Sequence, residues 1–196
     1  MAYAHESTIG LLEFASIARG IECVDRVLKE ASVRVLFSRP VSPGKYVVLF
    51  TGSVDDVDAS LRAAAVLGAD ALVDRLFLPA VHESVLATLE RPLMIPPLDA
   101  VGVLETATVA STLLAADVAA KTASVLLFEM QLAQGLGGKS FVSFCGSVGD
   151  VEVALDAGAA DAERRGLLIG RVLIPRAHEQ MREVFERHDR PLTTEG

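Results

Sequence analysis

The sequence has few of the residues on which disulfide-rich, metal-binding or aromatic-cored proteins depend. Its 196 residues include two cysteines, Cys23 and Cys145, no tryptophan and only 5% aromatic residues. The cysteines stand in unlike contexts without a Cys-x-x-Cys spacing, which argues against a disulfide framework and a four-thiolate metal site and fits a reducing compartment. The four histidines show no ligand spacing, so we expect no metal and no cofactor.

Long apolar runs and basic clusters are also missing. No run reaches the roughly 18 residues that cross a bilayer, and the N-terminus lacks the plan of a signal peptide, so we expect a cytoplasmic protein without membrane contact. Basic residues number 18 against 26 acidic ones, and this net charge of −8 argues against a nucleic-acid partner. Nothing matches a nucleophile with its base, a phosphate-binding loop or a dinucleotide fingerprint, so we expect no enzyme.

Apolar residues make up 51% of the chain and charged residues 22%, which predicts a packed, globular protein. The mean hydropathy is +0.41, high for a chain without a membrane segment. We therefore expect exposed apolar surface that contacts between subunits cover.

The chain contains an internal repeat. Residues 10–13, Gly-Leu-Leu-Glu, return as Gly-Val-Leu-Glu at 102–105, and ten of the 25 positions from Ile9 to Val33 are identical at this shift of 92. The shift grows to 94 and then to 96 along the chain, so short insertions separate the later elements. These matches predict two copies of one domain at 8–90 and 100–187. A proline-rich linker (91–99) joins the copies, and a tail (188–196) follows them.

Each copy alternates strand and helix patterns. In the first copy we expect strands at 9–14, 33–38, 45–51 and 73–78, a helix at 17–31, a second helix capped by Ser53 or Asp55, and a short helix opened by Pro79. We expect Ile17, Ile21, Val24, Leu28 and Ala31 to form the apolar face of the first helix, and Val57, Leu61, Ala65 and Leu67 that of the second. The order β-α-β-β-α-β-α predicts an α+β fold of two tandem ferredoxin-like domains.

The repeated motifs resemble the bacterial microcompartment shell domain. Matching segments lie at 10–13, 25–33, 44–45 and 52–57, and again at 102–105, 117–125, 138–139 and 174–178. The resemblance spans both repeats in unpermuted strand order. It implies a structural shell component, located in the shell of a microcompartment in the cytoplasm. It further implies a homotrimer that imitates the hexamer of single-domain members, packs edge to edge with other shell proteins, and passes small metabolites through a central pore.

The resemblance also assigns residues to the edge of the trimer. Lys29 and Lys121 match the family's edge lysine, and Arg176 matches its edge arginine, where Ala80 stands in the first repeat. His82 and His178 lie in the same edge segment, and we favour a cap or surface role for each over metal ligation. Without the resemblance, either lysine would be interpreted as an ordinary exposed helix residue.

The resemblance places two hairpin turns at the pore. They are Ser42-Pro43-Gly44 and Leu136-Gly137-Gly138. Pro43 makes the first turn rigid and removes a donor, whereas the glycine-rich second turn can bring backbone N–H groups close to a polar or anionic guest. An equal alternative from the residues alone is that the glycines serve only the geometry of the turn.

Two alternatives remain open from the residues alone. One is a small-molecule sensor or regulator of tandem ferredoxin-like domains, with residues 135–138 as its binding loop. The other is an electron-transfer shell protein with a cluster in its pore, although neither turn contains a cysteine. Glu13 and Glu105 suggest paired general acids, but we favour acceptance of free N–H groups at helix N-termini.

Overall fold

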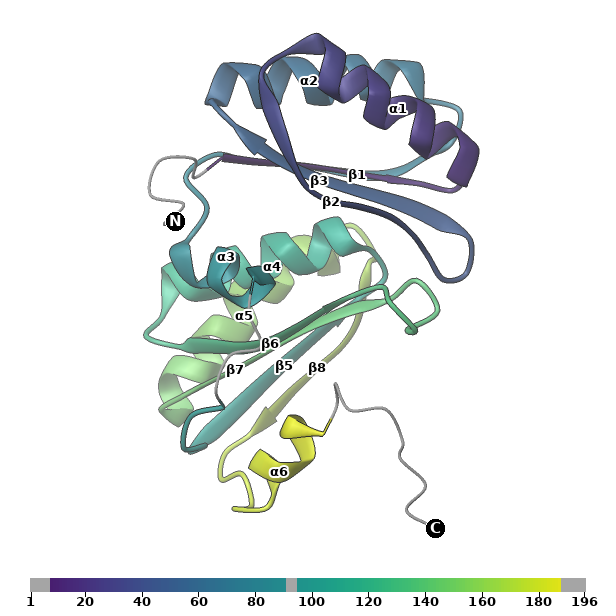
Figure 1. Cartoon of the computed structure of the whole chain (residues 1–196). Helices are drawn as coiled ribbons and strands as arrows, with labels where there is room; N and C mark the ends of the chain where they lie inside the picture. Colours follow the sequence, from purple (N-terminus) through teal and green to yellow (C-terminus); the bar gives the residue numbers. More distant parts are fainter. Residues whose placement is uncertain (1–7, 91–94, 188–196) are drawn as a thin grey trace.

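The computed structural model describes residues 8–90 and 95–187 and contains two repeats of the predicted topology. Residues 91–94 of the predicted linker, and the predicted tail at 188–196, lie outside the described residues. Figure 1 shows the repeats stacked, each with its own sheet and its own pair of covering helices.

The first repeat is a four-stranded antiparallel sheet with order β2-β3-β1-β4. Helices α1 and α2 cover one of its faces (Figure 1). Its elements are β1 (Thr8–Phe14), α1 (Ile17–Glu30), β2 (Val33–Val41), β3 (Lys45–Gly52), α2 (Val54–Leu67), β4 (Leu72–Leu78) and α3 (Glu83–Glu90).

The second repeat has the same plan, with sheet order β6-β7-β5-β8. Its elements are β5 (Ala100–Thr106), α4 (Val109–Thr122), β6 (Leu126–Leu132), β7 (Ser140–Gly146), α5 (Val148–Arg164), β8 (Leu168–Ile174) and α6 (Met181–Glu186). The strand registers agree, since Gly10 faces Phe50 in one sheet and Gly102 faces Phe144 in the other. The tandem ferredoxin-like fold is therefore confirmed.

The caps and ends of the helices decide the remaining local predictions. The hydroxyl of Ser53, not Asp55, caps α2 by accepting a hydrogen bond from the Asp56 N–H at 3.2 Å. The third helix begins at Glu83 and not at Pro79, because the intervening residues form a turn in which Ala80 has a φ of 52°. Leu67 was expected inside but is 37% exposed at the end of α2.

The predicted apolar face of α1 does not lie wholly on the core: Val24 packs there, but three of its other members do not. Gly20, Cys23 and Val27 face the core of the first repeat. Ile17, Ile21 and Leu28 lie on the other side and are 40%, 56% and 51% exposed. The apolar stripe read from the sequence is thus a second apolar surface, separate from the face that packs on the helix's own sheet.

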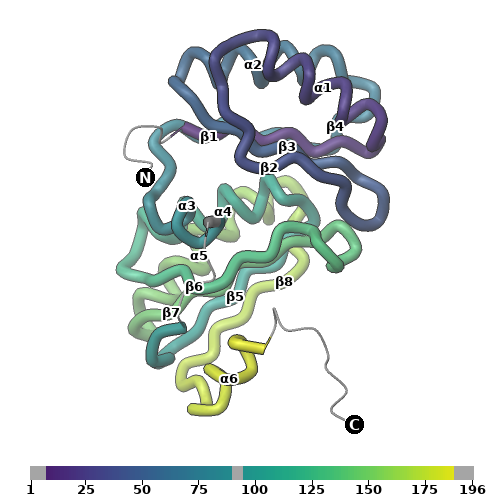
Figure 2. The backbone as a smooth tube through the Cα atoms, viewed as in Figure 1, coloured from purple at the N-terminus to yellow at the C-terminus, as the bar shows by residue number. Residues whose placement is uncertain are grey.

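The repeats meet along one extended contact, which we call the seam. At the seam, the face of the first sheet that α1 and α2 leave open packs on α4 (Figures 1 and 2). Helix α3 crosses from the first repeat and packs against α4 and β6. The molecule is therefore a stack of alternating helical and sheet layers, with α4 between two sheets.

Helix α4 suits this position because alanine, valine and leucine occupy most of its positions. Only Lys121 and Thr122, at its end, are exposed. Its alanines allow close packing on both sheets, and a helix that is apolar all round is stable only when it is buried all round. Buried side chains of the first sheet, α4 and the second sheet consequently form one continuous core.

No helix among residues 8–90 and 95–187 combines the length and the apolar character that a membrane span requires.

A truncation within the seam tests this shared core. Leu113 of α4 is fully buried, so we expect Leu113→Ala to lower the free energy of unfolding by about 2–5 kcal/mol. Val66→Ala is the control, because Val66 is 78% exposed and its truncation should change stability by less than about 0.5 kcal/mol. Urea unfolding followed by circular dichroism measures both, and equal effects would show that α4 is not held between the sheets.

Candidate functional site

The two hairpin turns singled out in the sequence lie next to each other. A Cβ built on Gly138 would meet Pro43 Cδ at 3.0 Å and the Ser42 carbonyl oxygen at 3.3 Å. Gly138 also has a φ of +88°, so both its conformation and this close approach favour glycine. Figures 1 and 2 show the β2–β3 and β6–β7 tips at the same side of the molecule. The glycine is needed where one turn touches the other, which sequence reasoning did not reveal.

The outer parts of these turns face open space. Ser42, Pro43 and Gly44 are exposed, and so is Gly137. A Cβ on Gly44 or on Gly137 would meet no atom within 4 Å. The turns therefore form one exposed, mostly uncharged surface at one side of the molecule (Figure 2).

Next to each turn lies an ion pair between one lysine and one glutamate. Lys45 donates to Glu13 at 2.8 Å, and Lys139 lies 3.1 Å from Glu105. The side chain of Glu13 is completely buried, whereas that of Glu105 is 36% exposed. The repeats thus carry the same pair in two environments.

Glu13 also joins the repeats. Its second oxygen accepts a hydrogen bond from the backbone N–H of Val109, at the start of α4, at 3.0 Å. Burial raises the pKa of the Glu13 carboxyl, while Lys45 and the Val109 N–H oppose the rise and the facing Asp74 adds to it. The expected acceptor role at a helix N-terminus is confirmed for Glu13, and the helix belongs to the other repeat.

A second polar cluster at the seam was missed by sequence reasoning. Asp74 of β4 is buried and accepts hydrogen bonds from the Thr108 hydroxyl at 2.6 Å and from the Arg165 guanidinium at 2.5 Å. The only signal was an acidic residue within an apolar strand. The cluster has no copy in the other repeat, because Gly170 replaces Asp74 in the register with β5 and Ala69 replaces Arg165 in the aligned sequence.

The predicted edge residues divide into two groups. In the first, Asp117 of α4 accepts hydrogen bonds from the His82 backbone N–H and the Lys121 ammonium, both at 2.7 Å. This brings His82 and Lys121 to one corner of the seam. The ring of His82 accepts a hydrogen bond from the Ser84 N–H at 3.2 Å, a local capping contact.

The second group lies apart on outer elements of the chain. Lys29 pairs with Asp25 along α1 at 2.5 Å and is 69% exposed. Arg176 and His178 are exposed after β8, where the His178 ring accepts a hydrogen bond from the Gln180 N–H at 3.2 Å. Lys29 and His178 thus repeat the local surroundings of Lys121 and His82 without meeting each other.

The cysteines lie away from both turns. Cys23 is on α1 and Cys145 on β7, both are buried as free thiols, and burial raises the pKa of each. Among the described residues, no group of three His, Cys, Asp or Glu side chains is placed to hold a metal ion. These thiols are packed as small apolar side chains.

Exposed apolar side chains mark two further surfaces. Ile17 and Ile21 of α1 correspond to Val109 and Leu113 of α4, which the first sheet covers completely. On the open face of the second sheet, Val172 is 52% exposed, whereas its counterpart Leu76 is only 7% exposed. Each repeat therefore has the two apolar surfaces that meet in the seam, one on a helix and one on the open face of its sheet. The helix surface of the first repeat and the sheet surface of the second are left exposed.

Comparisons with known proteins agree with this arrangement. Residues 8–81 and 100–177 each match the BMC domain. The chain is 40% identical over 173 residues to the bacterial microcompartment shell protein PduT of Citrobacter freundii, covering 88% of this chain and 94% of that protein. It is 36% identical over 88 residues to the shell protein EutM of Salmonella typhimurium, covering 45% of this chain and 90% of EutM.

A solved structure shows the same fold. A microcompartment protein from Desulfitobacterium hafniense DCB is 43% identical to this chain and superposes with a TM-score of 0.81. The match covers 90% of this chain and 98% of that one.

The buried cluster around Asp74 gives a test of how the seam is held. Arg165→Ala leaves a buried carboxylate without its cation, so we expect a loss of about 1–3 kcal/mol in the free energy of unfolding. In the Asp74→Asn background the same change should cost clearly less, because the carboxylate charge is gone. Denaturant unfolding of the four proteins measures the coupling, and strictly additive effects would contradict it.

Proposed function

Since the chain belongs to the BMC family of bacterial microcompartment shell proteins, we propose that three copies close into a pseudohexagonal ring with a central pore for small metabolites. The chain is a structural component of the shell of a bacterial microcompartment.

The unused halves of the seam carry the proposal. Within the chain, the open face of the first sheet covers α4. The same relation between chains would place the open face of the second sheet, with Val172, on Ile17 and Ile21 of the next copy. Six repeats joined by such contacts make a ring of three chains, in which contacts within chains and between chains alternate.

Polar groups support the same contact between chains. In the seam, Glu13 accepts from the N–H of Val109 and Asp117 accepts from the N–H of His82. In the other repeat, Glu105 corresponds to Glu13 and Ile17 to Val109, while Asp25 corresponds to Asp117 and His178 to His82. Glu105 would accept from Ile17, and Asp25 from His178, across each boundary between copies. Glu105 and Asp25 each already pair with the lysine that corresponds to their counterpart's partner.

The pore is proposed to be lined by both turns. They touch at Gly138 and lie at one side of the stack, so a ring would bring three pairs of turns together (Figure 2). The lining residues would be Ser42, Pro43, Gly44, Leu136, Gly137 and Gly138. Open space around Gly44 and Gly137 suits a passage for small guests.

The edges of the ring are proposed to include Lys29, Lys121, His82, Arg176 and His178, which would contact other shell proteins laterally. We assign no catalysis to the chain, because Glu13 and Glu105 are occupied by lysines and, for Glu13, by the helix N-terminus. The sensor and the cluster-bearing shell protein gain no support, since the matched family is a shell domain and both cysteines lie outside the turns.

A charge on the uncovered face of α1 tests the ring. We expect Ile21→Asp to leave the chain folded but to prevent trimer formation, because each boundary between copies would bury a carboxylate at a cost of about 2 kcal/mol or more. Size-exclusion chromatography with light scattering measures the mass. Val54→Asp is the control, because Val54 and its counterpart Val148 are both exposed and neither meets the seam. A trimer that survives Ile21→Asp would refute the proposed contact.

A second variant separates the edge from the ring. Lys29→Ala combined with Lys121→Ala should keep the trimer and impair its growth into extended sheets, seen by electron microscopy. Arg62→Ala, which removes a charge from an exposed pair on α2, should form sheets like the natural protein. Dissociated trimers, or sheets as extensive as before, would contradict the edge assignment.

A further inference from the structure

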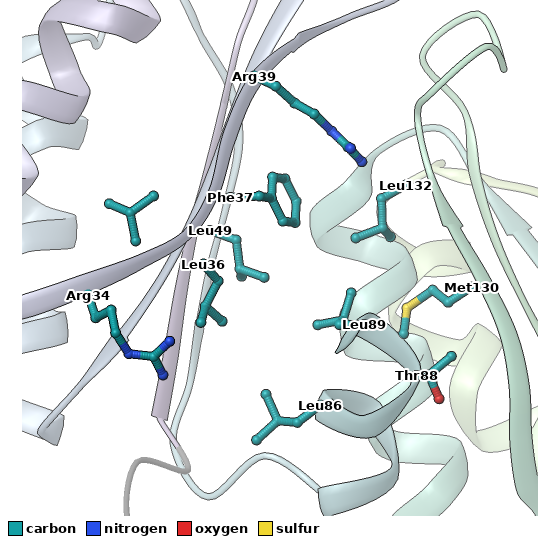
Figure 3. Close-up of a pocket in the computed structure, with 11 residues that line it drawn as sticks. Arg34, Leu36, Phe37, Arg39, Leu49, Leu86, Thr88, Leu89, Met130 and Leu132 are labelled. Carbon is teal, nitrogen blue, oxygen red and sulfur yellow. The ribbon is translucent and has the colours of Figure 1, made fainter. Parts of the chain in front are cut away.

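A cavity of about 490 Å³ lies between the repeats, and its lining residues come from outside the two turns. Its volume falls within the range of roughly 300–1,000 Å³ that small-molecule sites occupy. Figure 3 shows one wall formed by the first sheet, with Leu36, Phe37 and Leu49. The other wall is formed by α3, with Leu89, and by β6 of the second repeat, with Met130.

Two arginines of β2 stand at the ends of this apolar middle. Arg34 and Arg39 lie on opposite sides of the leucines, and Arg39 extends towards the second repeat (Figure 3). The guanidinium of Arg39 lies 5.0 Å from the centre of the Phe37 ring, a cation–π contact that holds it at the cavity. Most of the residues that line the cavity are therefore apolar, and an arginine stands at each end.

Arg39 also has an unused donor. Among the described residues, its Nε is buried and has no hydrogen-bond partner. A buried donor without an acceptor costs free energy. Because the positive charge is shared over the whole guanidinium, an anion in the cavity can pair with Arg39 without reaching Nε.

The cationic character belongs to the first repeat alone. By strand register and repeat alignment, Leu126 replaces Arg34, Glu129 replaces Phe37 and Gln131 replaces Arg39 in the second repeat. A role in building the common fold would be shared by both repeats. The two arginines are therefore not required by the fold that the repeats share.

We propose that this cavity binds a small organic anion with an apolar body, of which an aliphatic carboxylate is the simplest example. The carboxylate pairs with Arg39, and the hydrocarbon lies along Leu49, Leu89 and Met130. Because the walls come from both repeats, the bound anion stabilises the seam. The site lies within one chain, so it stands or falls independently of the ring.

Calorimetric titration of the full-length protein with sodium octanoate tests the site. We expect saturable binding of one octanoate per chain, with acetate and octanol binding far more weakly because one lacks the apolar body and the other the charge. Octanol binding as tightly as octanoate would overturn the proposal, since no guanidinium would then be read. Absence of saturable octanoate binding would also overturn it.

Two further measurements locate the binding. Arg39→Gln, which installs the residue of the second repeat, should weaken octanoate binding about tenfold or more, while Arg62→Gln on exposed α2 should leave it unchanged. In the unaltered protein, octanoate should shift the NMR signal of the Met130 methyl group, a readout that does not depend on a variant's folding. Equal affinity in Arg39→Gln, or an unmoved Met130 signal, would place the binding elsewhere and refute the site.

Discussion

Everything in this structure follows from one constraint, which is that helix α4 lies between two sheets and has almost no solvent-facing side. Apolar packing alone would not fix its position, because alanine side chains offer a smooth surface. The buried carboxylates of Glu13 and Asp74 fix it, because each accepts hydrogen bonds from the other repeat in addition to one from its own. Most of the surface buried in the seam is thus apolar, whereas polar contacts fix how the two repeats align.

Much of the fold was predictable because comparison of the two copies shows where elements end and loops begin. Insertions of two residues between matching motifs marked the loops, and turn and strand patterns occurred twice. The third helix was misplaced because a proline can precede a turn as easily as a helix, and only the φ of Ala80 distinguishes them. Leu67 was misplaced because helical periodicity does not reveal where a helix stops being covered.

The site was predicted less completely, for a physical reason. Ile17, Ile21 and Leu28 were correctly read as apolar and periodic, but periodicity does not say which partner covers a face. Asp74, Thr108 and Arg165 come from three distant parts of the chain, and no spacing in the sequence connects them. The contact of Gly138 with Pro43 is equally long-range, so its glycine could be read only as a turn residue.

The replacement of Asp74 by Gly170 shows what joining two repeats in one chain makes possible. A ring built from identical single domains must use one sequence at every boundary, so any change is copied all the way round. A doubled chain can strengthen every second boundary and leave the others free to vary. Covalent duplication therefore separates the requirement for cohesion from the freedom to diverge.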